Sequence, residues 1–186
     1  MSGGVDSSTV AALLMERGYQ VEGLTMRLWH EPPAEGAPPA AESASASARS
    51  VCEYLGIPHH VLDLEQAFYE QVVSYFIQEY ARARTPNPCL ICNRLLKFGA
   101  LLDYTREQGG NFLATGHYVR LHQDEAGRWH LLRGVDRRKD QSYVLYALRQ
   151  EQLRALLFPL GEMTKEQVRA YARERGLPVA DRPESQ

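Results

Sequence analysis

The sequence lacks a hydrophobic run long enough to cross a membrane and a segment that would direct export. A membrane-spanning helix needs about 20 consecutive apolar residues, and no apolar run in these 186 residues approaches that length. The N-terminus shows neither the basic flank nor the apolar core of a secretion signal. We therefore expect a cytoplasmic protein with no membrane partner.

Cysteine is scarce, with three residues in the chain: Cys52, Cys89 and Cys92. An odd number of cysteines without an export signal argues against a disulfide framework and favours reactive or metal-binding thiols. Cys52 lies between Val51 and Leu55 on an expected helix, where a small core residue is the better interpretation. This leaves Cys89 and Cys92 for chemistry.

A large excess of one charge is also missing, since the formal net charge is -2. This value argues weakly against a nucleic-acid partner, but the local distribution of charge matters more. Basic residues gather in two groups: Arg133, Arg137, Arg138 and Lys139 in one, and Arg82, Arg84, Arg94 and Lys97 around the cysteine pair in the other. An RNA partner therefore stays open.

Helical and strand patterns alternate along the chain. Five helices are expected. The first is "DSSTVAALLMERG", which ends at Gly18, the second ends near Gly56, and the third covers residues 65–83. The fourth ends at Gly109, and the fifth runs from the capping box of Thr164 and Gln167 to Gly176. Strands are expected in "VEGLTMRLW", "HHVLDL" and "NFLATGHY", with a hairpin around "DEAG" and a mobile surface loop in "HEPPAEGAPPAAESASASA". This alternation predicts an α/β fold with a parallel sheet and helices on both faces, which binds ligands at the carboxyl ends of its strands.

A glycine-rich loop opens the chain as "SGGVDSS", residues 2–8. Gly3 and Gly4 let the backbone approach a ligand closely, and the helix that follows offers free N–H groups and its dipole to an anion. The loop lacks the lysine and the spacing of the P-loop, and it is not G-x-G-x-x-G either. A glycine turn with an Asp or Ser helix cap is the simpler alternative.

The cysteine pair has C-x-x-C spacing in "TPNPCLICN", which we expect to be a loop because two prolines interrupt it, with Asn93 opening the next helix. The helix dipole and the nearby Arg94 and Lys97 would lower a thiol pKa. Three interpretations compete: a nucleophilic cysteine, half of a zinc or iron-sulfur site, or two buried thiols. Zinc normally takes four ligands, and no second C-x-x-C or paired His motif follows, although His59 and His60 are present.

The string S-G-G-x-D-S-[ST] resembles the pyrophosphate (PP) loop of the ATP pyrophosphatases. Five segments also occur in the order and approximate spacing of the tRNA-specific 2-thiouridylases: "SGGVDSS", "TPNPCLICNRLLKFG", "LATGHYVR", "KDQSYVLYAL" and "FPLGEMTKEQVR". The resemblance implies a Rossmann-like PP-loop ATPase domain of the adenine nucleotide alpha hydrolase-like class. It also implies that ATP, with Mg²⁺, drives the replacement of oxygen by sulfur at carbon 2 of the wobble uridine in tRNAs for Lys, Glu and Gln. A sulfur-relay protein or a cysteine desulfurase would supply the sulfur.

The resemblance also implies roles for individual residues. The ATP site would be formed by Ser2, Gly3, Gly4, Val5, Asp6, Ser7, Ser8, Met26 and Gly116. Contacts to the target base would come from Asn87, Pro88 and Cys89, and contacts to tRNA from His117, Lys139, Asp140 and Gln141. Cys92 matches the family nucleophile, and Cys89 joins it as a catalytic candidate. Taken alone, "ATGHY" is a strand end with a tight turn, and "KDQ" is a solvated helix start.

The sequence departs from the family pattern at the cysteine pair and at its end. Many members carry aspartate where this chain has Cys89, and the pair could instead form a disulfide or supply two ligands of a [4Fe-4S] cluster. The chain stops after "RPESQ", before the place of the family's second, persulfide-bearing cysteine. We therefore expect residues 1–186 to be the N-terminal catalytic domain, truncated at both ends and lacking its first strand. The family's central and C-terminal tRNA-binding domains would then be absent.

Two other classes of function stay open. One is another adenylating PP-loop enzyme that acts on a small molecule, although that chemistry needs no thiol. The other is a non-catalytic RNA module that binds a metal or an iron-sulfur cluster.

Overall fold

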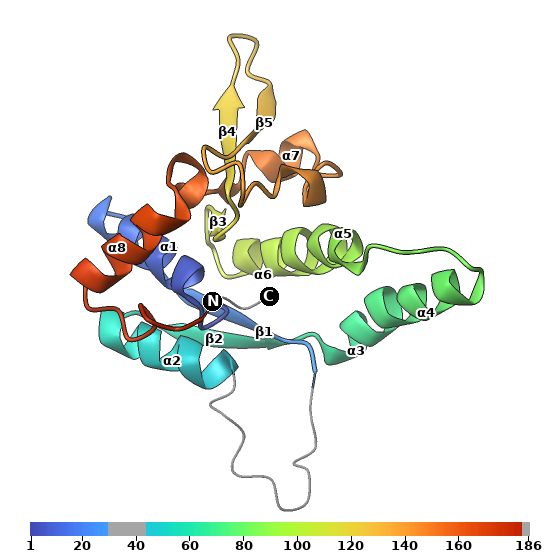
Figure 1. The fold of residues 1–186 in the computed structure, drawn as a ribbon, viewed down its shortest axis with the longest axis horizontal. Coiled ribbons are helices and arrows are strands. Elements are labelled where there is room, and N and C mark those ends of the chain that lie inside the picture. Colours follow the sequence, from blue (N-terminus) through green and yellow to red (C-terminus); the bar gives the residue numbers. More distant parts are fainter. Residues whose placement is uncertain (30–43, 184–186) are drawn as a thin grey trace, which may run out of the picture.

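The computed structural model describes residues 1–29 and 44–183, so most of the predicted surface loop lies outside the described residues. Helix α1 (Val5–Glu16) precedes strand β1 (Gly23–Arg27), and helix α2 (Ala44–Leu55) precedes strand β2 (His59–Asp63). The two strands pair in parallel along their whole length, as strands joined through a crossover helix do. The predicted alternation of helix and strand is confirmed in this part of the chain (Figure 1).

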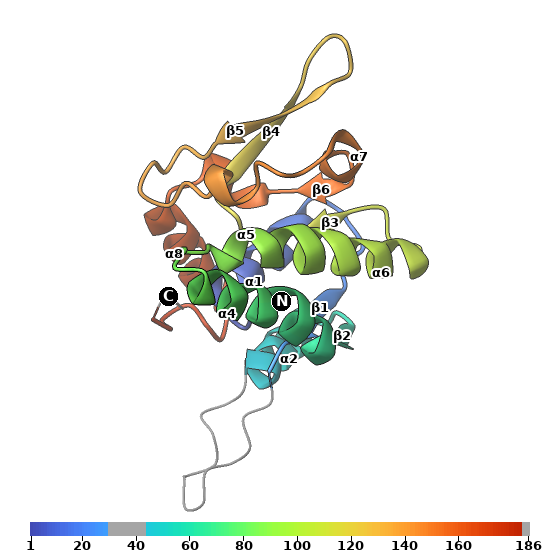
Figure 2. The same cartoon turned by 90° about the vertical axis from the view of Figure 1, so that its right-hand side faces the viewer.

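Two long helical segments come next, each with a π-helical stretch inside it. The first consists of α3 (Glu65–Phe68), η1 (Tyr69–Val73) and α4 (Ser74–Ala81), and the second of α5 (Pro88–Cys92), η2 (Asn93–Ala100) and α6 (Leu101–Glu107). Helix α5 packs on η1, and Figure 2 shows the second segment running as one helix above the first. The predicted helices over residues 65–83 and up to Gly109 are confirmed.

The second helical segment begins at Pro88, earlier than the predicted start at Asn93, so the expectation of a loop through both cysteines is wrong. Pro88 occupies the first helical position, where its missing N–H would have no partner and its fixed φ suits the helix. The Asn87 side chain caps the helix, because its Oδ1 accepts a hydrogen bond from the Cys89 N–H at 3.1 Å. Cys89 and Cys92 are therefore both on a helix.

The last part of the chain places short strands beside a hairpin. Strands β3 (Leu113–Ala114) and β6 (Leu156–Leu157) pair in parallel, while β4 (Val119–Gln123) and β5 (Trp129–Arg133) form the predicted antiparallel hairpin. The hairpin projects from the body of the molecule in both views (Figures 1 and 2). The remaining elements are η3 (Ser142–Val144), α7 (Gln150–Leu153), η4 (Pro159–Glu162) and α8 (Lys165–Glu174).

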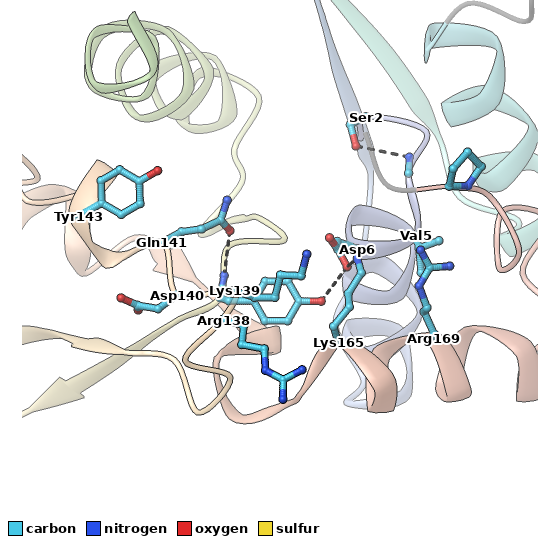
Figure 3. A pocket seen from close by; sticks show the side chains of 13 residues that line it. Ser2, Val5, Asp6, Arg138, Lys139, Asp140, Gln141, Tyr143, Lys165 and Arg169 are labelled. Atoms are coloured by element: carbon cyan, nitrogen blue, oxygen red, sulfur yellow. Dashed lines mark hydrogen bonds and ion pairs between the residues drawn. The ribbon is translucent and has the colours of Figure 1, made fainter. Parts of the chain in front are cut away.

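Helix α8 begins with the predicted capping box. Thr164 Oγ1 accepts a hydrogen bond from the Gln167 N–H, and Gln167 Oε1 accepts one from the Thr164 N–H. Two otherwise unpaired N–H groups are thereby satisfied, which fixes where the helix starts. This start places the next residue, Lys165, at the end of the helix that faces the glycine loop (Figure 3).

The described strands form three two-stranded sheets, so the predicted single parallel sheet is correct only in part. The alternation of elements predicts parallel pairing, but it does not predict which pairs join into one ladder. The main chain of Met1 lies along β1: its N-terminal nitrogen donates to the Leu24 carbonyl, and its carbonyl accepts a hydrogen bond from Thr25 Oγ1. In the described residues Met1 therefore lies beside β1, and no ladder links β1 to β3.

Two apolar clusters form the core and meet at the start of β4. One cluster joins α1 to α8 and includes Val10 and Val168, and the other includes Phe98 from the second helical segment. Tyr118 belongs to the first cluster and its neighbour Val119 to the second. Through these two adjacent residues, the apolar cluster of α1 and α8 is connected to the apolar cluster beside the hairpin.

Cys52 lies on α2 with 1% of its surface exposed. The prediction that it is a core residue is confirmed. Within residues 1–29 and 44–183, no helix combines the length and the apolar character that a membrane crossing requires.

Candidate active site

The glycine loop turns directly into α1. Gly3 has a φ of +72°, which residues with a Cβ rarely adopt, and Gly4 is the N-cap of α1 without any side-chain cap. The serines fold back on this turn: Ser8 Oγ donates to the Gly4 carbonyl at 2.9 Å, and the Ser2 and Ser7 hydroxyls lie 3.1 Å apart. The first N–H groups of α1 are therefore left for an anion.

Asp6, in the first turn of α1, joins three parts of the chain. Its Oδ1 accepts hydrogen bonds from Tyr118 Oη at 2.9 Å and from Lys165 Nζ at 2.7 Å. The Lys165 side chain is 11% exposed and that of Asp6 is 33% exposed, so little water screens this ion pair. The Asp6 carboxylate thus holds the starts of α8 and β4 against the glycine loop (Figure 3).

The turn after β3 also packs on the glycine loop. A Cβ at Gly116 would lie 2.9 Å from Asp6 Cβ and 3.3 Å from the main-chain nitrogen of Ser7. These atoms belong to a helical turn, so they cannot move aside as the end of a flexible side chain could. The glycine of "ATGHY" is therefore required by the close approach of two backbones. Its predicted contact with ATP stays a prediction.

A pocket of about 390 Å³ lies in front of the loop. Its lining combines predicted residues of two distant segments: Ser2, Gly4, Val5 and Asp6 with Lys139, Asp140 and Gln141. Figure 3 shows the two groups on opposite sides, with the Arg138 and Lys165 side chains between them. The cations that line the pocket are Arg138, Lys139, Lys165 and Arg169. The pocket therefore suits an anionic ligand.

Asp140 and Gln141 shape the turn that carries the basic segment. Asp140 Oδ1 accepts a hydrogen bond from the Gly134 N–H at 3.1 Å, and its Oδ2 accepts one from Ser142 Oγ at 2.8 Å. Gln141 Oε1 accepts a hydrogen bond from the Tyr118 N–H at 3.2 Å. Gln141 thus holds the segment against the start of β4, and Asp140 holds it against the residue that follows β5. The tRNA contacts predicted for this segment stay predictions.

The His117 side chain is buried, with 8% of the residue exposed. Its Nδ1 lies 2.8 Å from Thr115 Oγ1, and its ring packs against Phe98 and Phe158. Burial, reinforced by the charge of Lys97, lowers the pKa of His117 to about 3. The His117 ring is therefore neutral at physiological pH. The predicted contact of His117 with tRNA stays a prediction, and it would require the ring to leave this apolar position.

The cysteine pair lies outside the pocket lining. Cys89 is exposed, Cys92 is half-buried and both thiols are free, so the structure holds no disulfide between them. Burial raises the pKa of Cys92, while the charge of Lys97 opposes this and Cys89 adds to it. The predicted lowering of this thiol pKa is wrong for Cys92, because the effect of burial outweighs the opposing charge of Lys97.

Eight further predicted residues do not line the pocket either: Gly3, Ser7, Ser8, Met26, Asn87, Pro88, Gly116 and His117. Met26 lies in β1 and packs, partly buried, against the second apolar cluster. Asn87 and Pro88 form the start of α5, next to the cysteines. The predicted site therefore separates into the pocket and a cysteine segment, Asn87–Cys92, that the pocket does not include.

The complete chain, residues 1–186, matches the family model of the tRNA methyl transferase HUP domain. The chain belongs to this HUP domain family. It is 52% identical over 191 residues to the tRNA-specific 2-thiouridylase MnmA 1 of Caldanaerobacter subterraneus subsp. tengcongensis. It is 53% identical over 189 residues to the tRNA-specific 2-thiouridylase MnmA of Chloroflexus aurantiacus. Each match covers 100% of this chain and 52% of the relative, so the chain spans about half the length of these relatives.

A solved structure resembles this HUP domain in fold. It is the crystal structure of a predicted subunit of tRNA methyltransferase from Methanocaldococcus jannaschii, with a TM-score of 0.54 and 18% sequence identity. The match covers 94% of this chain and 72% of that chain. The family match and this likeness confirm the adenine nucleotide alpha hydrolase-like class, and the relatives confirm the resemblance drawn from the five motifs.

Six residues that line the HUP domain pocket were not predicted as site residues: Tyr118, Arg138, Tyr143, Lys165, Arg169 and Pro183. A signal was present for two of them, because Lys165 and Arg169 are four residues apart at the start of a capped helix and so share one face. Tyr118 directly follows the predicted His117. The local sequence patterns do not show that the fold brings α8 next to the glycine loop.

The donor groups of the HUP domain fit Mg²⁺ better than an iron-sulfur cluster. In the two described ranges, no three His, Cys, Asp or Glu side chains come together to hold a metal ion. Asp6 and Asp140 line the pocket, and Mg²⁺ is commonly held by one or two carboxylates together with substrate phosphates. A [4Fe-4S] cluster takes about four thiolates, whereas Cys89 and Cys92 supply two.

Proposed function

We propose that this protein uses ATP to replace oxygen by sulfur at carbon 2 of the wobble uridine in tRNAs for Lys, Glu and Gln. The relatives that match its whole length at 52% and 53% identity are, by name, tRNA-specific 2-thiouridylases. The structural observation that supports the proposal is the shared pocket, in which the glycine loop faces the basic segment Arg138–Gln141. A phosphate-binding loop and a cationic segment in one pocket suit a reaction between ATP and an RNA base.

The first step is adenylation of the base. The uracil 2-oxygen attacks the α-phosphorus of ATP, pyrophosphate leaves, and AMP stays on the oxygen that must later depart. The N-terminus of α1 and the cations Arg138, Lys165 and Arg169 hold the phosphate charge in place. Mg²⁺, held by Asp6 or Asp140 together with the phosphates, would neutralise charge on the leaving pyrophosphate.

The second step delivers sulfur at the cysteine segment. The terminal sulfur of a persulfide, loaded by a sulfur-relay protein or a cysteine desulfurase onto the family's second cysteine, attacks carbon 2, and AMP leaves with the oxygen. The Cys92 thiolate then attacks the inner sulfur of that cysteine, a disulfide forms between the two cysteines, and the outer sulfur stays on the base. Because burial raises its pKa, Cys92 is mainly a thiol at neutral pH and must first lose a proton.

The test is pyrophosphate release from ATP, with and without tRNA that carries a wobble uridine. The proposal expects release that depends on this tRNA and stops when the wobble uridine is replaced by cytidine. Release without tRNA, or release driven by a small molecule, would assign the protein to another adenylating family. Bound iron and acid-labile sulfide without ATP turnover would favour a non-catalytic RNA module.

A further inference from the structure

Two exposed tyrosines follow the basic segment. Tyr143 is 64% exposed and Tyr146 is 73% exposed, whereas the two residues between them, Val144 and Leu145, are 7% and 1% exposed. Tyr143 lies in η3, which ends at Val144, and Tyr146 lies two residues beyond that end. Two large rings are therefore presented to solvent on a turn whose other residues are anchored in the core.

The residues around the two tyrosines are fixed by packing and by hydrogen bonds, so the main chain that carries the rings is well ordered. Val144 and Leu145 belong to the second apolar cluster. The Leu145 N–H donates to the Ser142 carbonyl at 3.1 Å, and Ser142 is itself held by Asp140. A ligand that stacks on these rings would therefore bind a surface that needs little ordering of the main chain.

The surroundings of the rings are cationic. Arg137 and Arg138 are exposed, and Tyr143 lines the same pocket as Arg138 and Lys139. Figure 3 shows Tyr143 on the side of the pocket that carries Gln141, across from the glycine loop. The carboxylate of Asp136 in the same segment accepts hydrogen bonds from the Arg138 and Lys165 N–H groups. An exposed aromatic ring that lines a pocket together with cations matches a ligand with flat apolar faces and a polyanionic backbone.

We propose that Tyr143 and Tyr146 form a stacking platform for unpaired RNA bases, with Arg137 and Arg138 binding the adjacent phosphates. Single-stranded nucleotides are recognised in this way, by aromatic side chains that stack on the bases and cations that follow the backbone. The platform opens onto the pocket through Tyr143, so it would hold nucleotides that neighbour the base under reaction. The identity of the RNA as a tRNA anticodon loop rests on the proposed function.

The test compares two double variants of the protein: Tyr143→Ala with Tyr146→Ala, and Tyr143→Phe with Tyr146→Phe. The probe is a fluorescently labelled anticodon stem-loop RNA with a wobble uridine, and the readout is the Kd by anisotropy at several salt concentrations. The alanine variant should bind roughly tenfold more weakly for each base that loses its stack. The phenylalanine variant should bind like the wild type, because a phenyl ring stacks without the hydroxyl.

The salt dependence separates stacking from charge. The alanine variant should keep the wild-type slope of log Kd against log salt, whereas Arg137→Gln should reduce that slope by about one phosphate contact. Thermal melting followed by circular dichroism checks that each variant is folded. Wild-type affinity in the folded alanine variant would overturn the platform, as would an equal loss in the phenylalanine variant or a defect confined to binding of a sulfur-donor protein.

The platform and the proposed function can fail separately. Pyrophosphate release that depends on tRNA, combined with unchanged RNA binding by the alanine variant, removes the platform alone. RNA binding that depends on the two rings, combined with pyrophosphate release that ignores tRNA, removes the proposed function alone.

Discussion

The Lys165 side-chain nitrogen lies 2.7 Å from Oδ1 of Asp6, a residue 159 positions earlier in the chain. A P-loop carries its phosphate-binding lysine within the loop itself, whereas "SGGVDSS" contains none. Helix α8 instead brings Lys165 and Arg169 to the pocket in front of this loop. Two of the four cations that line the pocket in front of the glycine loop therefore come from a helix more than 150 residues further along the sequence.

Lys165→Met should weaken the binding of ATP more than that of AMP, because it removes a cation from the pocket and leaves the Asp6 charge facing the phosphates. A hydrogen bond to a charged group contributes about 1.5–3 kcal/mol, so the Kd for ATP should rise by roughly 10- to 100-fold. Titration calorimetry with both nucleotides measures the difference. Lys165→Arg keeps the charge and should retain most of the affinity, and an equal loss for ATP and AMP would contradict this role.

Gly116→Ala should lower the melting temperature and weaken ATP binding together. The new Cβ would lie 2.9 Å from Asp6 Cβ, so the turn after β3 must move away from the first turn of α1. Overpacking of this kind typically costs about 1–3 kcal/mol, measurable by thermal melting. Gly99→Ala is the matched control, because its Cβ would meet only the Arg94 carbonyl at 3.4 Å. Equal stability of the two variants would show that the turn has room to adjust.

Alkylation of Cys92 should increase from neutral to alkaline pH, since only the thiolate reacts and burial holds its pKa above the ordinary value. Lys97→Gln removes the charge that opposes this rise, so the Cys92 pKa should increase further and alkylation at a fixed pH should slow. Mass spectrometry of the Cys92 peptide after brief iodoacetamide treatment gives the rate. Arg94→Gln serves as control, and a faster reaction in Lys97→Gln would contradict the prediction.

Protein stability should fall as the pH drops from 6.5 towards 3 because of His117. Its pKa is about 3 in the folded protein against 6.5 in an unfolded chain, so in this window the unfolded state binds the extra proton. The free energy of unfolding then decreases by up to about 1.4 kcal/mol per pH unit, which urea denaturation at several pH values would measure. His117→Asn should flatten this dependence. An NMR titration in which the His117 ring protonates near 6.5 would contradict the assignment.

Local patterns predicted local structure because each pattern is satisfied within a few residues. Thr164 and Gln167 form the capping box that their spacing indicates, and Gly18 and Gly176 end their helices with φ values of +84° and +62°. The glycine loop turns into a helix whose first N–H groups have no side-chain cap. All of these depend on hydrogen bonds or backbone angles that neighbouring residues determine.

The features that sequence reasoning missed depend on tertiary contacts or on competition between two effects. The pairing of Asp6 with Lys165 joins two ends of the chain, and no spacing rule encodes it. A proline inside a helix predicts an interruption, whereas the Asn87 cap makes Pro88 the first helical residue. The Cys92 pKa follows burial rather than the charge of Lys97, and burial is not visible in a loop sequence.

The bonds of Asp6 to Tyr118 and Lys165 also set an order of events during synthesis on the ribosome. Lys165 emerges 159 residues after Asp6 of the glycine loop. A nascent polypeptide that stops before α8 therefore carries the complete loop without two cations of the pocket. In such a polypeptide the Asp6 carboxylate lacks the Lys165 partner that it has in the folded domain, so the charge balance of the pocket is established only once α8 has docked.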